Sequence, residues 1–337
     1  MTDSTPERIR LAHGGGGTLM QQLIEQHILP LYADPALARH DAAALALPHG
    51  RLAFTCDSSV VQPLEFPGGD IGRLAVVSTA NDLAMAGARP LHLSLALILE
   101  EGLELPLLRR LLASVATAAH QAGVTVVTGD TKVVGRGQAD GLFISTSGIG
   151  LLEVEAPVHP QRIRSGDQLL VSGDLGRHGI ALAAARHGLQ LEPPLLSDCA
   201  LLWPLVQGLL SAGVQLHALR DLTRGGLASA LHELALACGH RLVVEESLLP
   251  LDPQVERCCE VLGFEPLHLA CEGRLVAVVP PAHRATAEAL LVAAGGAWIG
   301  EVVATAPDEA AGVLLRTRWG GERRLLPLSG ELLPRIC

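Results

Sequence analysis

Four aspartates stand at the predicted ends of strands or helices, where side chains from different elements can meet. They are Asp57 in "TCDSSV", Asp82 in "TANDLA", Asp130 in "TGDTK" and Asp221 in "RDLTRGG". Carboxylates that converge at loop ends supply the hard oxygen ligands that Mg²⁺ prefers, and Mg²⁺ can bridge them to a nucleotide triphosphate. A single Asp in such a place is more often a turn former or a helix cap. Four of them favour a site for a nucleotide and a divalent cation.

Lys132 is the only lysine among the 25 basic residues of the chain, and it follows Asp130 by two positions. Arginine keeps its proton at any accessible pH, whereas lysine is compact and titrates when it is partly buried. A nearby carboxylate would hold the ammonium charged, and burial would lower its pKa. Lys132 is therefore a candidate either for clamping a phosphate or for transferring a proton.

Glu272 precedes Gly273 in "ACEGRLVAVV", at the predicted start of a strand. A glutamate in that position is usually solvated, so a part in the chemistry is the less common alternative. We keep Glu272 as a second candidate for proton transfer.

The glycines Gly14, Gly15, Gly16 and Gly17 in "AHGGGG" precede a predicted helix. Consecutive glycines let the backbone approach a ligand, and the N–H groups and dipole at a helix start favour anions. The run is either a phosphate-binding loop or a flexible N-terminal arm. It is not a Walker loop, because the chain contains no GxxxxGK[ST] pattern.

The seven cysteines are an odd number, scattered and without a CxxC pair, so they indicate neither a disulfide framework nor a zinc ribbon. Six of them lie in apolar or mixed segments, where a buried structural thiol is the usual finding. Cys337 differs, because it ends the chain in "LPRIC" and chain termini are usually exposed and mobile. We therefore expect a reduced thiol on a mobile tail.

Composition narrows the possible partners. Aromatic residues make up 2% of the chain and the formal net charge is −10, so nucleic acid is not an expected partner. No apolar run reaches the length of a membrane span, and the N-terminus lacks the features of a signal peptide. The 14 histidines show no HExxH pattern. These features predict a globular, cytoplasmic protein without a membrane anchor.

The length of 337 residues and the periodicity predict two α/β domains. In the first half we expect a helix capped by Thr18 with Gln21 as its capping-box partner, strands ending at Asp57 and Asp130, and a helix stopped by Gly87. Near Gly320 and Gly321 the pattern predicts a hairpin. The expected organisation is a glycine-rich arm and helix over 1–40, domains over 41–155 and 156–326, and a tail over 327–337.

Taken together, several stretches resemble the HypE family of hydrogenase maturation proteins over nearly the whole chain. They are "AHGGGG", "TCDSSVVQPLEFPGGDIGRLAVVSTANDLAMAGARP", "VTGDTKVV", "LRDLTRGG", "EG" at 272–273 and the terminal "LPRIC". The middle motifs are shared with the PurM-like ATP-binding superfamily of aminoimidazole ribonucleotide synthetase, selenophosphate synthetase and thiamine-monophosphate kinase. The "PRIC" ending narrows the resemblance to HypE. The family pattern has Asn before the Glu, where this chain has Cys271.

The resemblance implies an α/β PurM-like fold in a homodimer, with ATP and Mg²⁺ near the interface of the N-terminal domains. It implies that the carbamoyltransferase HypF loads a carbamoyl group on the terminal thiol, that ATP-dependent dehydration gives a thiocyanate, and that the cyanide passes to iron on a HypC–HypD scaffold. Carried over by residue, it makes Cys337 the acceptor, and Lys132 and Glu272 candidates for proton transfer. The candidates for nucleotide or Mg²⁺ binding are Gly14, Gly15, Gly16, Gly17, Asp57, Asn81, Asp82, Asp130, Thr131 and Asp221, the four aspartates being the metal candidates.

Two other functions are compatible with the motifs. One is a different ATP-dependent kinase or synthetase of the same superfamily, which would need no terminal cysteine. The other is a scaffold without catalytic activity, whose cysteine tail carries a ligand or metal to a partner.

Overall fold

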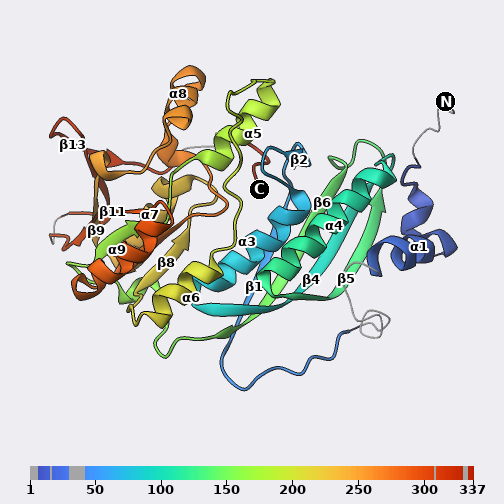
Figure 1. The fold of residues 1–337 in the computed structure, drawn as a ribbon, viewed down its shortest axis with the longest axis horizontal. Helices are drawn as coiled ribbons and strands as arrows, with labels where there is room; N and C mark the ends of the chain where they lie inside the picture. Colours follow the sequence, from blue (N-terminus) through green and yellow to red (C-terminus); the bar gives the residue numbers. More distant parts are fainter. Residues whose placement is uncertain (1–6, 16, 30–41, 307–308, 329–332) are drawn as a thin grey trace. The chain divides into compact units, whose positions relative to one another are not determined.

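The computed structural model describes residues 7–15, 17–29, 42–306, 309–328 and 333–337. The chain divides into two compact units, the first comprising residues 1–83, 89–152 and 337 and the second residues 84–88 and 153–336. Both units combine a sheet with helices, as Figure 1 shows, so the predicted two-domain α/β architecture is confirmed. Among the described residues, no helix is long and apolar enough to span a bilayer.

The first unit contains a four-stranded sheet in the order β1-β6-β4-β5. Its strands are β1 (Leu52–Ser59), β6 (Leu142–Leu152), β4 (Ala88–Glu100) and β5 (Thr125–Val134), with β1 antiparallel to β6 and β4 parallel to β5. Helices α3 (Ile71–Met85) and α4 (Leu105–Ala122) cover one face (Figure 1). A short hairpin of β2 (Glu65–Phe66) and β3 (Gly69–Asp70) precedes α3.

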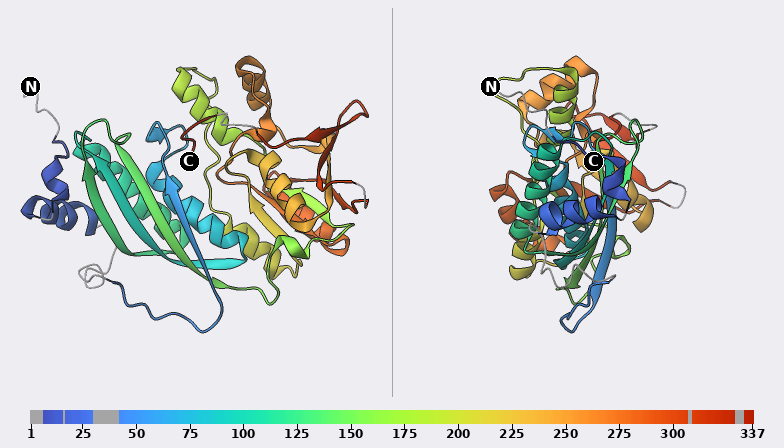
Figure 2. Two further views of the ribbon diagram at one scale, coloured as in Figure 1. Left: turned by 180° about the vertical axis from the view of Figure 1, so that it is seen from behind. Right: turned by 90° about the vertical axis from the view of Figure 1, so that its right-hand side faces the viewer.

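Strand alternation separates the two faces of this sheet. On the helix-covered face, Leu93, Leu95, Leu97 and Leu99 of β4 are buried. On the other face, Phe54 is 72% exposed, and Leu52 and Ile98 are also exposed. The view from behind in Figure 2 shows no described helix over this second face. We call it the open face.

The N-terminal segment of the first unit lies beside β5, with a 3₁₀ turn over Leu11–Gly14, helix α1 (Thr18–Leu23) and a π-helical turn over Ile24–Ile28. The predicted capping box is wrong. Gly17 is the N-cap residue and no side chain caps the helix, because Thr18 already has a helical position. The hydroxyl of a residue within the first turn does not have the N-cap geometry that reaches the free N–H groups.

The second unit contains a seven-stranded sheet in the order β13-β12-β9-β11-β7-β10-β8. The strands are β7 (Gln168–Val171), β8 (Ala218–Asp221), β9 (Arg241–Glu245), β10 (Leu275–Val279), β11 (Ala297–Val303), β12 (Gly312–Arg316) and β13 (Glu322–Leu325). The predicted hairpin near Gly320 is confirmed as the β12–β13 pair.

Helices cover both faces of this second sheet. Helix α7 (Gly226–Cys238) packs in one apolar cluster with one set of strand residues, and α6 (Trp203–Ser211) and α9 (Arg284–Ala293) pack in another cluster with the alternate set. Helices α5 (Arg177–His187) and α8 (Pro253–Leu262) share a third, smaller cluster. Short 3₁₀ turns cover Pro160–Arg162, Glu246–Leu248, Pro266–His268 and Pro281–His283.

Candidate functional site

Asp57 and Asp82 belong to the same side of the first sheet. Strand β1 continues two residues beyond Asp57, so the predicted strand end is wrong, because β1 stays paired with β6 as far as Ser59. Asp57 lies opposite the buried Thr146, on the helix-covered face. Asp82 lies within α3, three residues before its end, and its Oδ2 accepts a hydrogen bond from Thr55 Oγ1 at 2.9 Å. Thr55 and Asp57 are two residues apart in β1, so their side chains lie on the same face of the strand. The carboxylates of Asp57 and Asp82 therefore both lie on the helix-covered side of the sheet.

Asn81 and Thr131 are buried polar residues of the same unit. Asn81 of α3 is 2% exposed and Thr131 of β5 is 5% exposed. Thr131 is paired with the buried Leu97, which places it on the helix-covered face. Buried polar side chains that the fold retains are candidates for holding a ligand or for fixing neighbouring carboxylates.

Asp130 and Lys132 lie on the open face instead. Their partners on β4 are Ala96 and Ile98, and the Lys132 Nζ lies 3.1 Å from Asp130 Oδ1 and 3.0 Å from Oδ2. The hydrogen bond from Lys132 holds the pKa of the Asp130 carboxyl below its usual value. The predicted strand end at Asp130 is wrong, because pairing with β4 continues to Val134. The described structure therefore sets this ion pair on the opposite face of the sheet from Asp57.

The glycine run approaches the same strand. A Cβ atom on Gly14 would lie 2.8 Å from both the backbone N and the Cβ of Val133, so only glycine fits there. Gly15 donates its N–H to the Ala12 carbonyl at 3.4 Å, and Gly17 precedes α1. Gly16 lies outside the described residues. The loop thus lies against β5 directly after Lys132.

Asp221 and Glu272 belong to the second unit. Asp221 ends β8, as predicted, is 4% exposed, and accepts a hydrogen bond from Arg220 Nη1 at 3.0 Å. Glu272 does not open a strand, because β10 begins three residues later at Leu275. It lies in the preceding loop and is 2% exposed, contrary to the solvated position that is usual for glutamate. Its N–H donates to Asp198 Oδ1 at 3.1 Å.

An ion network beside Glu272 was not predicted. Asp174 Oδ1 lies 2.6 Å from Arg274 Nη2, and Arg274 Nε lies 3.7 Å from the buried Asp198. Burial raises the pKa of Asp198. Burial would also raise the pKa of Asp174, but Arg274 and Arg177 hold it below its usual value. Asp174 follows the strand in "QLLVSGD". An acidic residue after a predicted strand is the same sequence signal that made Asp57 a candidate.

Cys271, the departure from the family pattern, has a structural contact. The thiol is 1% exposed, and its Sγ accepts the N–H of Gly176 at 3.1 Å, where α5 begins. Burial raises the pKa of Cys271 well above its usual value, so it stays a neutral thiol. It ties the Glu272 loop to α5.

The Glu272 loop is enclosed by glycines at distances that exclude any side chain. A Cβ on Gly226 would lie 2.5 Å from the Leu269 carbonyl oxygen, and one on Gly273 would lie 2.0 Å from the Asp198 carbonyl oxygen. On α5, a Cβ on Gly179 would lie 3.0 Å from the Leu269 Cβ. Backbone packing at this distance fixes the loop more tightly than side-chain contacts would.

The cysteines match the predicted burial only in part. Cys199, Cys258, Cys259 and Cys271 are buried and Cys238 is half-buried, but Cys56 is exposed because it lies on the open face of β1. The prediction of an exposed terminal thiol is wrong, because Cys337 is half-buried and its carbonyl accepts the N–H of Val60 at 3.0 Å within the first unit.

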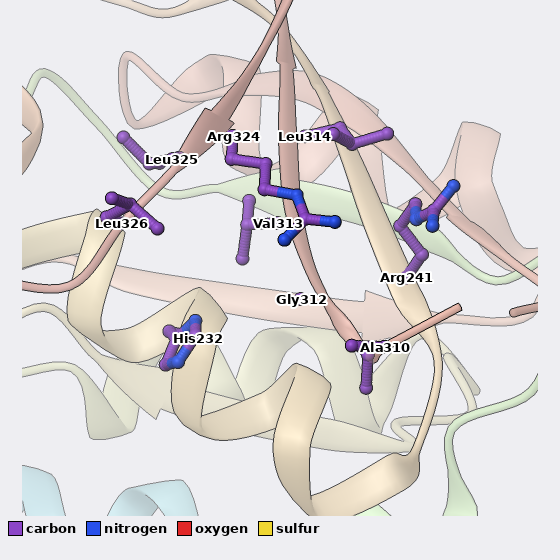
Figure 3. Close-up of a pocket in the computed structure, with 10 residues that line it drawn as sticks. His232, Arg241, Ala310, Gly312, Val313, Leu314, Arg324, Leu325 and Leu326 are labelled. Carbon is purple, nitrogen blue, oxygen red and sulfur yellow. The ribbon is translucent and has the colours of Figure 1, made fainter. Parts of the chain in front are cut away.

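Two cavities of the second unit contain none of the predicted residues. One of about 80 Å³ lies beside His232, Arg241 and Arg324 (Figure 3). Another of about 200 Å³ is lined by apolar residues and by four glutamates, Glu246, Glu256, Glu260 and Glu265. Within the described residues, no group of three or more His, Cys, Asp or Glu side chains is arranged to hold a metal ion.

The chain matches two family models, AIR synthase related protein, N-terminal domain, over residues 39–152 and AIR synthase related protein, C-terminal domain, over 164–311. It is 52% identical to carbamoyl dehydratase HypE of Rhodobacter capsulatus over 338 residues, 98% of each chain. The chain belongs to the HypE family. A crystal structure of hydrogenase maturation protein HypE in complex with ATP superposes with a TM-score of 0.93 at 43% identity, covering 97% of this chain and 99% of the other.

The chain also matches a chain in the crystal structure of a HypE–HypF complex, with a TM-score of 0.79 at 39% identity. The match covers 93% of this chain and 100% of the other. The matches cover 98% of the Rhodobacter capsulatus relative and both AIR synthase related domains.

Replacing Gly226 by Ala tests the close approach around the Glu272 loop. Gly226 is the first residue of α7 and Gly239 follows its last residue, and their φ angles are 58° and 74°. Of these two glycines, only Gly226 has neighbours within 4 Å of an added Cβ. We expect Gly239→Ala to lower the free energy of unfolding by about 1 kcal/mol through backbone strain alone. Gly226→Ala should lower it by about 3 kcal/mol, because the loop must also move. Urea unfolding measures both, and equal losses would contradict the packing described.

Proposed function

We propose that this chain, a carbamoyl dehydratase of the HypE family, carries its substrate on the Cys337 thiol and converts it there to a thiocyanate at the expense of ATP. The single observation that carries this assignment is a half-buried thiol at the chain end, in a protein that matches carbamoyl dehydratase relatives over 98% of its length. Cys258 and Cys259 belong to the apolar cluster that α5 and α8 share, and Cys271 belongs to the cluster that contains α7.

Two related crystal structures support the co-substrate and the first partner. One relative was crystallised with ATP, and another with HypF. We propose that this chain likewise binds ATP and receives its carbamoyl group from a HypF-type carbamoyltransferase. We also propose a cytoplasmic location and delivery of cyanide to iron on a HypC–HypD scaffold. Cell fractionation and co-purification with that scaffold test these two points.

The chemistry follows from a poor leaving group. The carbamoyl oxygen of the S–C(=O)–NH₂ group attacks the γ-phosphorus of ATP and releases ADP, and loss of one N–H proton gives a phosphorylated S–C(=NH)–O intermediate. Loss of the second N–H proton and of phosphate then forms the C≡N bond. The protein must stabilise charge on the phosphoryl group, take up two protons and exclude water, which would hydrolyse the intermediate.

Asp57 and Asp82 fit a Mg²⁺ ion that the nucleotide shares. Both lie on the helix-covered face, joined through Thr55, which orients one Asp82 oxygen. Mg²⁺ is usually held by one or two carboxylates together with phosphate oxygens rather than by an all-protein cage. When bound, the ion would neutralise charge on the phosphates. Asp130 and Asp221 are further candidates, together with Gly14–Gly17, Asn81 and Thr131 for the nucleotide.

Lys132 and Glu272 are proposed for the proton transfers and for phosphoryl stabilisation. The exposed Lys132 forms an ion pair with Asp130, and its compact ammonium suits a phosphate clamp. Glu272 is buried, so a carboxylate there is shielded from bulk water, as a group that receives a substrate proton must be.

A homodimer is proposed through the open face of the first sheet. Leu52, Phe54 and Ile98 expose apolar side chains there, on strands whose opposite face is well packed. An apolar sheet face of this kind is typical of a protein interface. Because Asp130 and Lys132 lie on the same face, a second copy would stand beside the proposed phosphate clamp.

Cys337→Ala should abolish carbamoylation and leave ATP binding within about twofold of wild type, because a terminal side chain contributes little to folding. Intact mass after incubation with ATP, carbamoyl phosphate and the transferase measures the first, and calorimetric titration the second. The matched control is Cys238→Ala, which removes a thiol that is likewise half-buried. Modification of the Cys337→Ala protein would refute the assignment.

Lys132→Arg keeps the charge but replaces a compact, titratable ammonium by a broad guanidinium. We expect ATP affinity to change by less than about threefold and the rate of thiocyanate formation to fall about 100-fold or more. The reverse exchange, Arg136→Lys, alters a nearby exposed cation and should change neither. Unchanged turnover in Lys132→Arg would mean that Lys132 acts only through its charge.

Phe54→Glu should dissociate the proposed dimer, because it places a carboxylate in an apolar contact. Trp319→Glu is the matched control, since it introduces the same charge at an aromatic residue that is 89% exposed on the second unit. Light scattering with size-exclusion chromatography measures the mass of each. A monomeric wild type, or a Phe54→Glu dimer as stable as wild type, would exclude this interface.

A further inference from the structure

The backbone of the C-terminal segment is held by two side chains of α5. Three successive carbonyl oxygens, those of Pro334, Arg335 and Ile336, each accept a hydrogen bond. Arg186 donates to the first two, at 2.7 Å from Nη1 to Pro334 and through Nη2 to Arg335. His178 Nε2 lies 2.8 Å from the Ile336 oxygen. The segment is thus bound by its main chain, in one register.

The protonation of His178 follows from its partners. A carbonyl oxygen can only accept, so the proton must be on Nε2, and Nδ1 then accepts from Ser197 Oγ at 2.7 Å. Ser197 Oγ is free to accept the N–H of Cys199 at 3.1 Å. Burial lowers the pKa of His178 to about 4, which keeps the ring neutral near pH 7 and is consistent with this arrangement.

Apolar contacts and a backbone turn complete the site. Leu333 packs against the cluster that α5 and α8 share, which contains Ile180 and Val255, and Ile336 is 7% exposed. Between them, Arg335 has a φ of 54° and is the only non-glycine residue of the described chain with a positive φ. Such a conformation persists only where the surrounding contacts enforce it. The carbonyl bonds to Arg186 and His178 supply that enforcement.

We infer that α5 forms a seat for the C-terminal segment, and that Arg186 and His178 are positioning residues that hold the Cys337 sulfur at a fixed place for dehydration. The inference rests on the proposed function and extends it from the acceptor thiol to the groups that locate it. The contacts that carry this inference are hydrogen bonds to main-chain carbonyls. Arg186 and His178 act through the main chain next to Cys337.

The two steps of the proposed cycle make opposite demands on this seat. Loading requires a separate enzyme to reach the thiol, which favours a released segment, whereas dehydration requires the loaded sulfur to return to one position. Loss of a seat contact should therefore leave loading unchanged or faster and slow dehydration. A residue needed only for folding would slow both steps.

The experiment uses Arg186→Ala and the full-length protein with ATP, carbamoyl phosphate and the transferase, followed by intact mass over time. Arg186→Ala removes the charge-assisted hydrogen bonds to two carbonyls, so the equilibrium constant for release of the segment should rise about tenfold or more. We expect the carbamoylated form to accumulate, because thiocyanate appears about tenfold more slowly than in wild type. Iodoacetamide should also alkylate Cys337 faster than in the wild-type protein.

The matched control is His187→Ala, which removes the adjacent exposed side chain of α5. Arg186→Lys keeps one donor cation and should give intermediate rates. His178→Gln keeps an N–H donor, so its rate of thiocyanate formation should be closer to wild type than that of His178→Ala. This pair tests the seat independently if an Arg186 variant folds poorly.

Two outcomes overturn the inference, and they differ from a failure of the proposed function. If wild type makes thiocyanate and folded Arg186→Ala does so at the same rate, or if loading and dehydration fall together, there is no positioning seat. If wild type itself is neither loaded nor dehydrated, the proposed function fails instead.

Discussion

The close approach of backbone to backbone around residues 266–273 is the constraint on which the second unit depends. Gly179 lets α5 lie against Leu269, and Gly226 lets α7 begin against the carbonyl of the same residue. Gly273 admits the Asp198 carbonyl at a distance that any Cβ would block. The loop that carries Glu272 and the helix that carries Arg186 are therefore parts of one packed body, and neither can shift without the other.

Charge fixes the same region in a complementary way. Arg274 donates to Asp174 and lies near the buried Asp198, while Arg177, at the start of α5, joins Asp174 to Asp252. A buried carboxylate without a cation would be costly, so these arginines are needed to keep the acidic residues in place. The network holds the start of α5 and the end of the Glu272 loop, the two points that the glycines bring into contact.

The sequence allowed the main elements and the hairpin near Gly320 to be predicted, because apolar periodicity and glycine breaks are local signals. It did not reveal on which face of a strand each acidic residue lies. Asp57 and Asp130 were both expected at strand ends, but β1 and β5 run further because their pairing partners do. A strand end depends on its neighbour in the sheet, which a single sequence does not contain. The burial of Glu272 was missed because its loop packs against Asp198, which is distant in the sequence.

The seat on α5 could not have been predicted from side-chain patterns, because it recognises carbonyl groups that every residue has. This form of recognition suits a carrier segment. The sulfur of Cys337 would be in turn a thiol, a thiocarbamate and a thiocyanate, which differ in size and polarity, whereas the carbonyls of Pro334, Arg335 and Ile336 stay the same. A seat that bound the sulfur substituent would favour one of these states and retain it. A seat that binds only the preceding backbone holds all three states of the sulfur in the same position. The progress of the cycle then depends on the chemistry at the sulfur and not on how tightly each state is bound.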